Sequence, residues 1–138
     1  MLWFRKSKKG FTLIELMVVV AIIGVLSLLG LRLYTGQQEK AKNAVVKANA
    51  GTVQTLIQGE LADNTVDTVE ASSYLNNLIN ESGIRNPYTG LAQTTNGTAG
   101  ADGNAGDVYV TESNDVFSIN GNDADGSPVY DPSLTARK

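Results

Sequence analysis

The chain has 138 residues, of which 42% are hydrophobic, and a formal net charge of −3 at pH 7. It contains neither cysteine nor histidine, which excludes thiol nucleophiles, disulfide bonds, zinc sites built from Cys and His, and acid–base catalysis by imidazole. A chain of this length has room for one modest domain.

The charges are distributed unevenly along the chain. Four of the eleven basic residues lie in the first ten positions, which carry no acid: Arg5, Lys6, Lys8 and Lys9. From Phe11 onward seven basic residues face fourteen acidic ones, and residues 63–138 carry a formal charge of −8. Because an acidic body repels phosphate backbones, we expect no direct binding of nucleic acid.

An apolar segment of twenty-one residues follows the basic cluster, from Phe11 to Leu31. Its only polar members are Thr12, Glu15 and Ser27. As a helix the segment would span about 30 Å, the thickness of the hydrocarbon core of a bilayer. Basic residues on its N-terminal side predict a single-pass membrane precursor with residues 1–10 in the cytoplasm and the chain after Tyr34 outside.

Two simpler interpretations of this segment compete. A cleaved secretory signal needs a small-x-small site after the apolar stretch, and residues 26–36 offer no convincing one. A plain membrane anchor has no need of Glu15, since a carboxylate at the bilayer centre costs about 2.5–3.5 kcal/mol. Glu15 is therefore a candidate functional residue that requires a partner.

The hexapeptide Gly10-Phe11-Thr12-Leu13-Ile14-Glu15 lies after a short basic leader and before an uninterrupted apolar helix. It resembles the class III signal of type IV pilins and of their pseudopilin relatives. The resemblance implies that a prepilin peptidase removes residues 1–10 by cutting after Gly10 and methylates the amine of Phe11. It further implies that Glu15 pairs with this amine during assembly, within a subunit or between neighbours.

The resemblance implies a structural protein. The sequence offers no phosphate-cradling loop, no nucleophile with an adjacent base and no metal-ligand cluster, so we expect no catalysis, no cofactor and no metal. Its partners would be further copies of itself in a surface filament, the prepilin peptidase, the membrane before assembly, and an assembly platform with its ATPase. Many pilins carry a helix-kinking proline where this chain has Arg32, so the resemblance does not extend that kink to this chain.

Four small residues recur at every third position of the apolar segment: Ala21, Gly24, Ser27 and Gly30. Small side chains let membrane helices approach one another closely, which makes these residues candidates for helix packing. The alternative is that glycine is simply common in membrane helices.

Residues 34–62 are more polar but keep a helical period in their apolar positions. The expected buried stripe is Ala41, Ala44, Val45, Ala48, Thr52, Val53, Leu56, Ile57 and Leu61. The pattern predicts one helix from Phe11 to about Ala62, composed of a membrane or filament-core half (11–33) and an amphipathic half (34–62) that packs against the head.

Residues 63–138 are expected to form a small α+β head. A polar connection at 63–70 precedes a short helix at 71–80, which ends near Gly83 and points Tyr74, Leu75, Leu78 and Ile79 inward. A turn at 86–90 and a flexible surface loop at 94–106 follow. Three strands, at 107–111, 115–119 and 128–130, are expected to form an antiparallel sheet on the helix, with turns at 112–114 and 120–127. This layout resembles cysteine-free pilins of Gram-positive type.

The segment from Asn122 to Gly126 invites comparison with a calcium-binding loop. An EF-hand reading would place Gly121 and Pro132 at its first and twelfth positions, and neither is a suitable ligand, so a plain turn is preferred. Two functional alternatives to a pilus subunit stay open. One is a pseudopilin of a type II secretion or competence system, and the other is an unprocessed, membrane-anchored binding protein.

Overall fold

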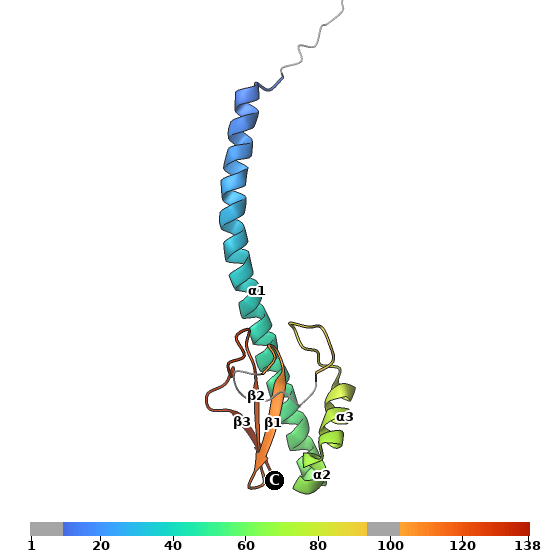
Figure 1. Ribbon diagram of the computed structural model, residues 1–138. Helices are drawn as coiled ribbons and strands as arrows, with labels where there is room; N and C mark the ends of the chain where they lie inside the picture. The colour runs from blue at the N-terminus through green and yellow to red at the C-terminus, as the bar shows by residue number, and fades with distance from the viewer. Residues whose placement is uncertain (1–9, 94–102) are drawn as a thin grey trace, which may run out of the picture. The chain divides into compact units, whose positions relative to one another are not determined.

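The computed structural model describes residues 10–93 and 103–138 (Figure 1). The elements in chain order are α1 (Leu13–Asp63), α2 (Val66–Glu70), α3 (Ser72–Ser82), β1 (Val108–Ser113), β2 (Val116–Gly121) and β3 (Leu134–Arg137). The chain divides into two compact units, one ending at Gln37 and the other beginning at Gln38. The expected α+β class is confirmed, as is the single helix predicted to end at about Ala62.

The three strands form one antiparallel sheet in the order β1-β2-β3. β1 and β2 are joined by a two-residue turn in which Asn114 and Asp115 both have positive φ, 55° and 63°. A turn with two positive φ angles matches the twist of a hairpin, and Asn and Asp tolerate it best after glycine. The first two predicted strands are therefore confirmed, with the turn at residues 114–115 in place of the predicted 112–114.

The third predicted strand, at 128–130, is wrong. Proline at its first position offers no N–H to a ladder, and the segment forms only a single bridge between Pro128 and Asn122. The third strand is instead β3, which pairs Ala136 with Phe117 and Leu134 with Ile119. Its sequence, Leu-Thr-Ala-Arg, is too short and too mixed to stand out as a strand.

The polar connection predicted at 63–70 is mostly helical: α2 occupies Val66–Glu70 and buries Val69 completely. The helix predicted at 71–80 is confirmed as α3, with Leu75 and Ile79 buried. Gly83 ends it in a left-handed conformation (φ 71°). The Tyr74 hydroxyl of α3 donates a hydrogen bond to Glu60 of α1, and this carboxylate raises the pKa of the phenol.

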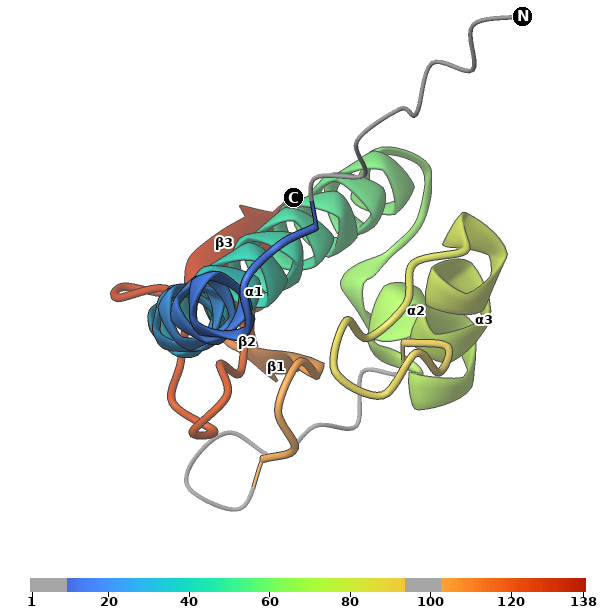
Figure 2. The same cartoon turned by 90° about the horizontal axis from the view of Figure 1, so that it is seen from above.

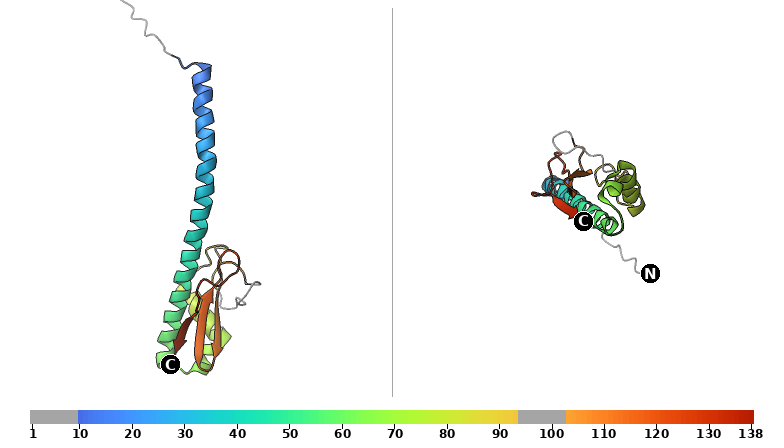
Figure 3. Two further views of the ribbon diagram at one scale, coloured as in Figure 1. Left: turned by 90° about the vertical axis from the view of Figure 1, so that its left-hand side faces the viewer. Right: turned by 90° about the horizontal axis from the view of Figure 1, so that it is seen from below.

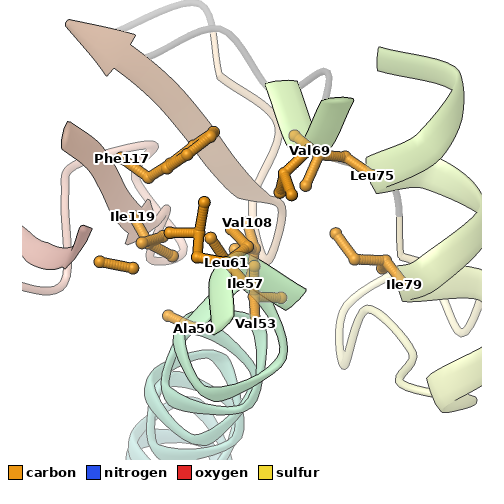
Figure 4. Close-up of a cluster of buried hydrophobic side chains, with 11 residues drawn as sticks. Ala50, Val53, Ile57, Leu61, Val69, Leu75, Ile79, Val108, Phe117 and Ile119 are labelled. Carbon is orange, nitrogen blue, oxygen red and sulfur yellow. The ribbon is translucent and has the colours of Figure 1, made fainter. Parts of the chain in front are cut away.

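The head core lies where the second half of α1 meets the sheet and the α2–α3 pair (Figures 2 and 3). Figure 4 shows its side chains converging from all of these elements. The residues that α1 buries are Val46, Asn49, Ala50, Val53, Ile57 and Leu61.

The expected stripe on α1 is thus confirmed for three of its nine residues. Val53, Ile57 and Leu61 are buried as predicted and Leu56 is half-buried, but Ala41, Ala44, Val45, Ala48 and Thr52 are exposed. The helix carries small apolar residues on two sides, so periodicity alone could not determine which side faces the head. The side with the larger branched residues does so, because it removes more apolar surface from water.

Two tyrosines from separate loops hold the head on the same stretch of α1. The Tyr88 hydroxyl donates to Asn43 Oδ1 (2.6 Å), and Lys42 Nζ lies 5.0 Å from the centre of the Tyr88 ring. The Tyr130 hydroxyl donates to the carbonyl of Lys47 (3.2 Å). The Lys47 Nζ lies 5.8 Å from the centre of the Tyr130 ring. These contacts hold two loops on α1, one around residue 88 and one around residue 130. The turn predicted at 86–90 is confirmed.

A side-chain amide organises the 86–90 turn. Asn86 Oδ1 accepts from the N–H groups of Tyr88 (2.7 Å) and Thr89 (3.2 Å). Its Nδ2 donates to the carbonyl of Ala105 (2.9 Å) and to Asp107 Oδ1 (2.7 Å). Most of the loop expected at 94–106 lies outside the described residues.

The sheet packs tightly on α1 at Gly121, where an added Cβ would overlap Cγ1 of the fully buried Val46. We expect Gly121→Ala to lower the free energy of unfolding by about 1–3 kcal/mol through overpacking. The matched control is Gly59→Ala, where no atom lies within 4 Å, and which should raise helix stability by about 1 kcal/mol. Denaturant unfolding of the detergent-solubilised chain measures both, and equal stability of the two variants would refute this packing.

Candidate functional site

The residues singled out by the sequence motif lie at the start of α1. Gly10, Phe11 and Thr12 precede the helix and are exposed, with 86% of the Phe11 side chain accessible to solvent. A Cβ at Gly10 would meet no atom within 4 Å. The bond between Gly10 and Phe11 therefore lies in exposed, non-helical backbone.

Thr12 and Glu15 form a reciprocal cap on α1. The Thr12 N–H donates to Glu15 Oε2 (3.0 Å), and the Glu15 N–H donates to Thr12 Oγ1 (3.3 Å). This capping box satisfies two of the N–H groups that a helix start leaves unpaired, and it places a carboxylate at the positive end of the helix dipole. The sequence identified Glu15 as an acid in need of a partner but did not identify Thr12 as that partner.

The first half of α1 presents apolar side chains on every side. From Leu13 to Leu33 its large hydrophobic residues are between 49% and 79% exposed. In the part of the chain that the structure describes, α1 is the one helix long and apolar enough to cross a membrane. Water is a poor solvent for such a surface, so lipid or other protein must cover it.

The small residues of this half do not form a straight stripe. In an α-helix a step of three residues falls about 60° short of a full turn, so Ala21 and Gly30 lie about 180° apart around the axis. Neighbours in the series still share a side, and the Cβ positions of Gly24 and Gly30 are open. The series thus winds around α1 and can serve more than one neighbouring helix.

No break occurs at Arg32. α1 is continuous from Leu13 to Asp63, and the Thr35 hydroxyl donates to the Arg32 carbonyl (3.0 Å). With arginine in place of proline, the backbone N–H and the helical φ/ψ angles are retained, so nothing at this position forces a kink.

The segment considered for calcium forms a turn. Asp123 Oδ1 accepts from the N–H groups of Asp125 (2.9 Å) and Ser127 (2.9 Å), which occupies this carboxylate with backbone donors. Within residues 10–93 and 103–138, no group of three or more His, Cys, Asp or Glu side chains could hold a metal ion.

Loss of the Thr12 hydroxyl should loosen the first turn of α1. In Thr12→Val, which keeps the side-chain volume, we expect the Glu15 amide to exchange with solvent about fivefold faster, since one N-cap hydrogen bond is gone. Thr12→Ser retains the hydroxyl and is the control. Hydrogen exchange of the full chain in detergent micelles measures the difference, and equal rates in the three proteins would contradict the capping box.

Comparison with known proteins gives one family model and several relatives. Residues 5–31 match the family model described as "Prokaryotic N-terminal methylation motif". The chain is similar to the fimbrial protein EcpB of Eikenella corrodens, with 37% identity over 90 residues, which cover 65% of this chain and 55% of that protein. No solved structure matches significantly.

Two further relatives extend the comparison. The type IV major alpha-pilin of Moraxella bovis is 30% identical over 112 residues, which cover 78% of this chain and 70% of that protein. The type IV major fimbrial protein FimA of Dichelobacter nodosus is 39% identical over 59 residues, 43% of this chain and 38% of that protein. The chain therefore spans between a third and about two thirds of the length of these relatives.

Proposed function

The chain belongs to the type IV pilin family, and from this premise we propose that it is made as a membrane precursor and assembled into a homopolymeric surface filament. A prepilin peptidase would cut between Gly10 and Phe11 and methylate Phe11. An assembly platform and its ATPase would then draw the subunit out of the membrane into a filament for adhesion, twitching motility or DNA uptake.

The observation that carries this proposal is the uncovered apolar surface of α1 from Leu13 to Leu33. Before assembly the acyl chains of the bilayer would cover it, with the basic residues 5–9 held in the cytoplasm. In a filament the same surface would face the helices of other copies. No part of this cycle requires a catalytic residue in the chain itself.

Processing would supply a cation for Glu15. Cleavage after Gly10 creates an ammonium group on Phe11, one residue before the Thr12 N–H that already donates to Glu15. In a water-free helix bundle a lone carboxylate or ammonium is costly, whereas a hydrogen-bonded pair is tolerated. Glu15 could receive the amine of its own chain or that of a neighbour, and the second arrangement would set the axial register of the filament.

The relatives favour the pilus over the pseudopilin alternative, since they are major pilins and fimbrial proteins. Long sheared fibres containing this chain would support the pilus. A short envelope-bound filament with a head that folds only in the presence of calcium would support the pseudopilin.

The role of Glu15 is tested by Glu15→Leu in the native host. We expect normal membrane insertion but at least a tenfold loss of sheared surface filaments, because an unpaired ammonium buried in the bundle costs several kcal/mol. Quantifying the chain in the membrane and in the sheared fraction measures both effects. Glu39→Gln, an exposed acid on the same helix, is the control and should assemble normally. Undiminished filament yield from Glu15→Leu would refute the proposed pairing.

A further inference from the structure

β3 lies at one edge of the sheet, with β2 on one side of it (Figure 1). The carbonyls of Thr135 and Arg137 point away from β2, because successive residues of a strand direct their backbone groups to alternate sides. An edge strand of this kind can pair with a strand of another molecule unless something occupies it.

Two glutamines of α1 occupy this edge. Gln54 Nε2 donates to the carbonyl of Thr135 (2.8 Å), and Gln58 Nε2 donates to the carbonyl of Arg137 (2.8 Å). The Arg137 N–H in turn donates to Gln58 Oε1 (3.3 Å). Gln58 thus satisfies both backbone groups of Arg137, as a residue of a neighbouring strand would.

The spacing of the glutamines matches that of the strand. Four residues of helix rise about 6 Å, and two residues of strand rise about 6.7 Å, so side chains at positions 54 and 58 reach successive outward carbonyls of β3. A glutamine amide has donor and acceptor groups like those of a peptide, which makes it a suitable substitute for a strand.

A third glutamine has a comparable place at the opposite edge of the sheet. With its amide oriented to suit both neighbours, Gln93 donates to the Gly106 carbonyl (3.2 Å) and accepts from the N–H of Val108, the first residue of β1 (2.6 Å). Gln93 is almost completely buried. Occupation of strand-edge groups by glutamine amides thus occurs at both edges of this sheet.

We propose that Gln54 and Gln58 close the β3 edge against strand-to-strand pairing between heads, so that copies join through their helices and not through their sheets. The inference rests on the proposed filament. Assembly would hold many heads at high local concentration, where an open edge invites irregular association.

The test compares the full chain in detergent micelles with its Gln54→Met/Gln58→Met variant, which keeps side-chain length but loses the amides. Gln37→Met, an exposed glutamine of the same helix, is the control. We expect the Arg137 amide to exchange about tenfold faster in the double variant, the loss expected for a hydrogen-bonded edge that opens. A Thr135→Cys reporter, added to this cysteine-free chain in each background, should be joined into dimers by a bis-maleimide only in the double variant.

Unchanged exchange at Arg137 would overturn the closure of the edge. Faster exchange without cross-linked dimers would overturn its role against pairing. Protection of the Phe117 amide shows that the head is folded, and Gln58→Met alone carries the same comparison if the double variant does not fold. Since the assay needs no filament, it stands or falls separately from the proposed function.

Discussion

The molecule depends on avoiding one unfavourable contact, that between water and the apolar surface of α1 from Leu13 to Leu33. About twenty residues of helix present hydrophobic side chains on all sides, each about half exposed or more. At about 25 cal/mol per Å² of apolar surface, leaving such a helix in water is strongly unfavourable. The helix therefore needs a surrounding other than water, which lipid and then the helices of other copies would provide in the proposed assembly.

The head has no disulfide bonds, and hydrogen bonds from side-chain amides hold several of its loops and one strand edge in place. Asn86 Nδ2 ties the 86–90 turn to the Ala105 carbonyl (2.9 Å), and Asn120 Nδ2 donates to the Tyr130 carbonyl (2.7 Å). Gln54 and Gln58 fasten β3 to α1. Because each such amide pairs with backbone, these bonds fix how loops and strand edges lie, while the apolar core of Val53, Ile57 and Phe117 provides the driving force for folding.

The sequence predicted the structure best at positions where the residue type tolerates only one kind of environment. An apolar run with a single acid predicted α1 and singled out Glu15, and Gly83 predicted the end of α3. Prediction failed where several residues compete for the same place. Val45 and Val46 are the same residue type on two apolar sides of α1, and only packing against the head buries Val46 and leaves Val45 exposed. β3 depends on pairing with β2, and the cap on α1 depends on hydrogen bonds between Thr12 and Glu15. The spacing of hydrophobic residues reveals neither.

In the proposed cycle, proteolysis converts a membrane-anchored precursor into a subunit whose helix is covered by other copies. Mass spectrometry of the N-terminal peptide from a sheared cell-surface fraction measures this conversion. We expect a chain that begins at Phe11 with a methylated amine. A surface chain that still begins at Met1 would refute the proposal.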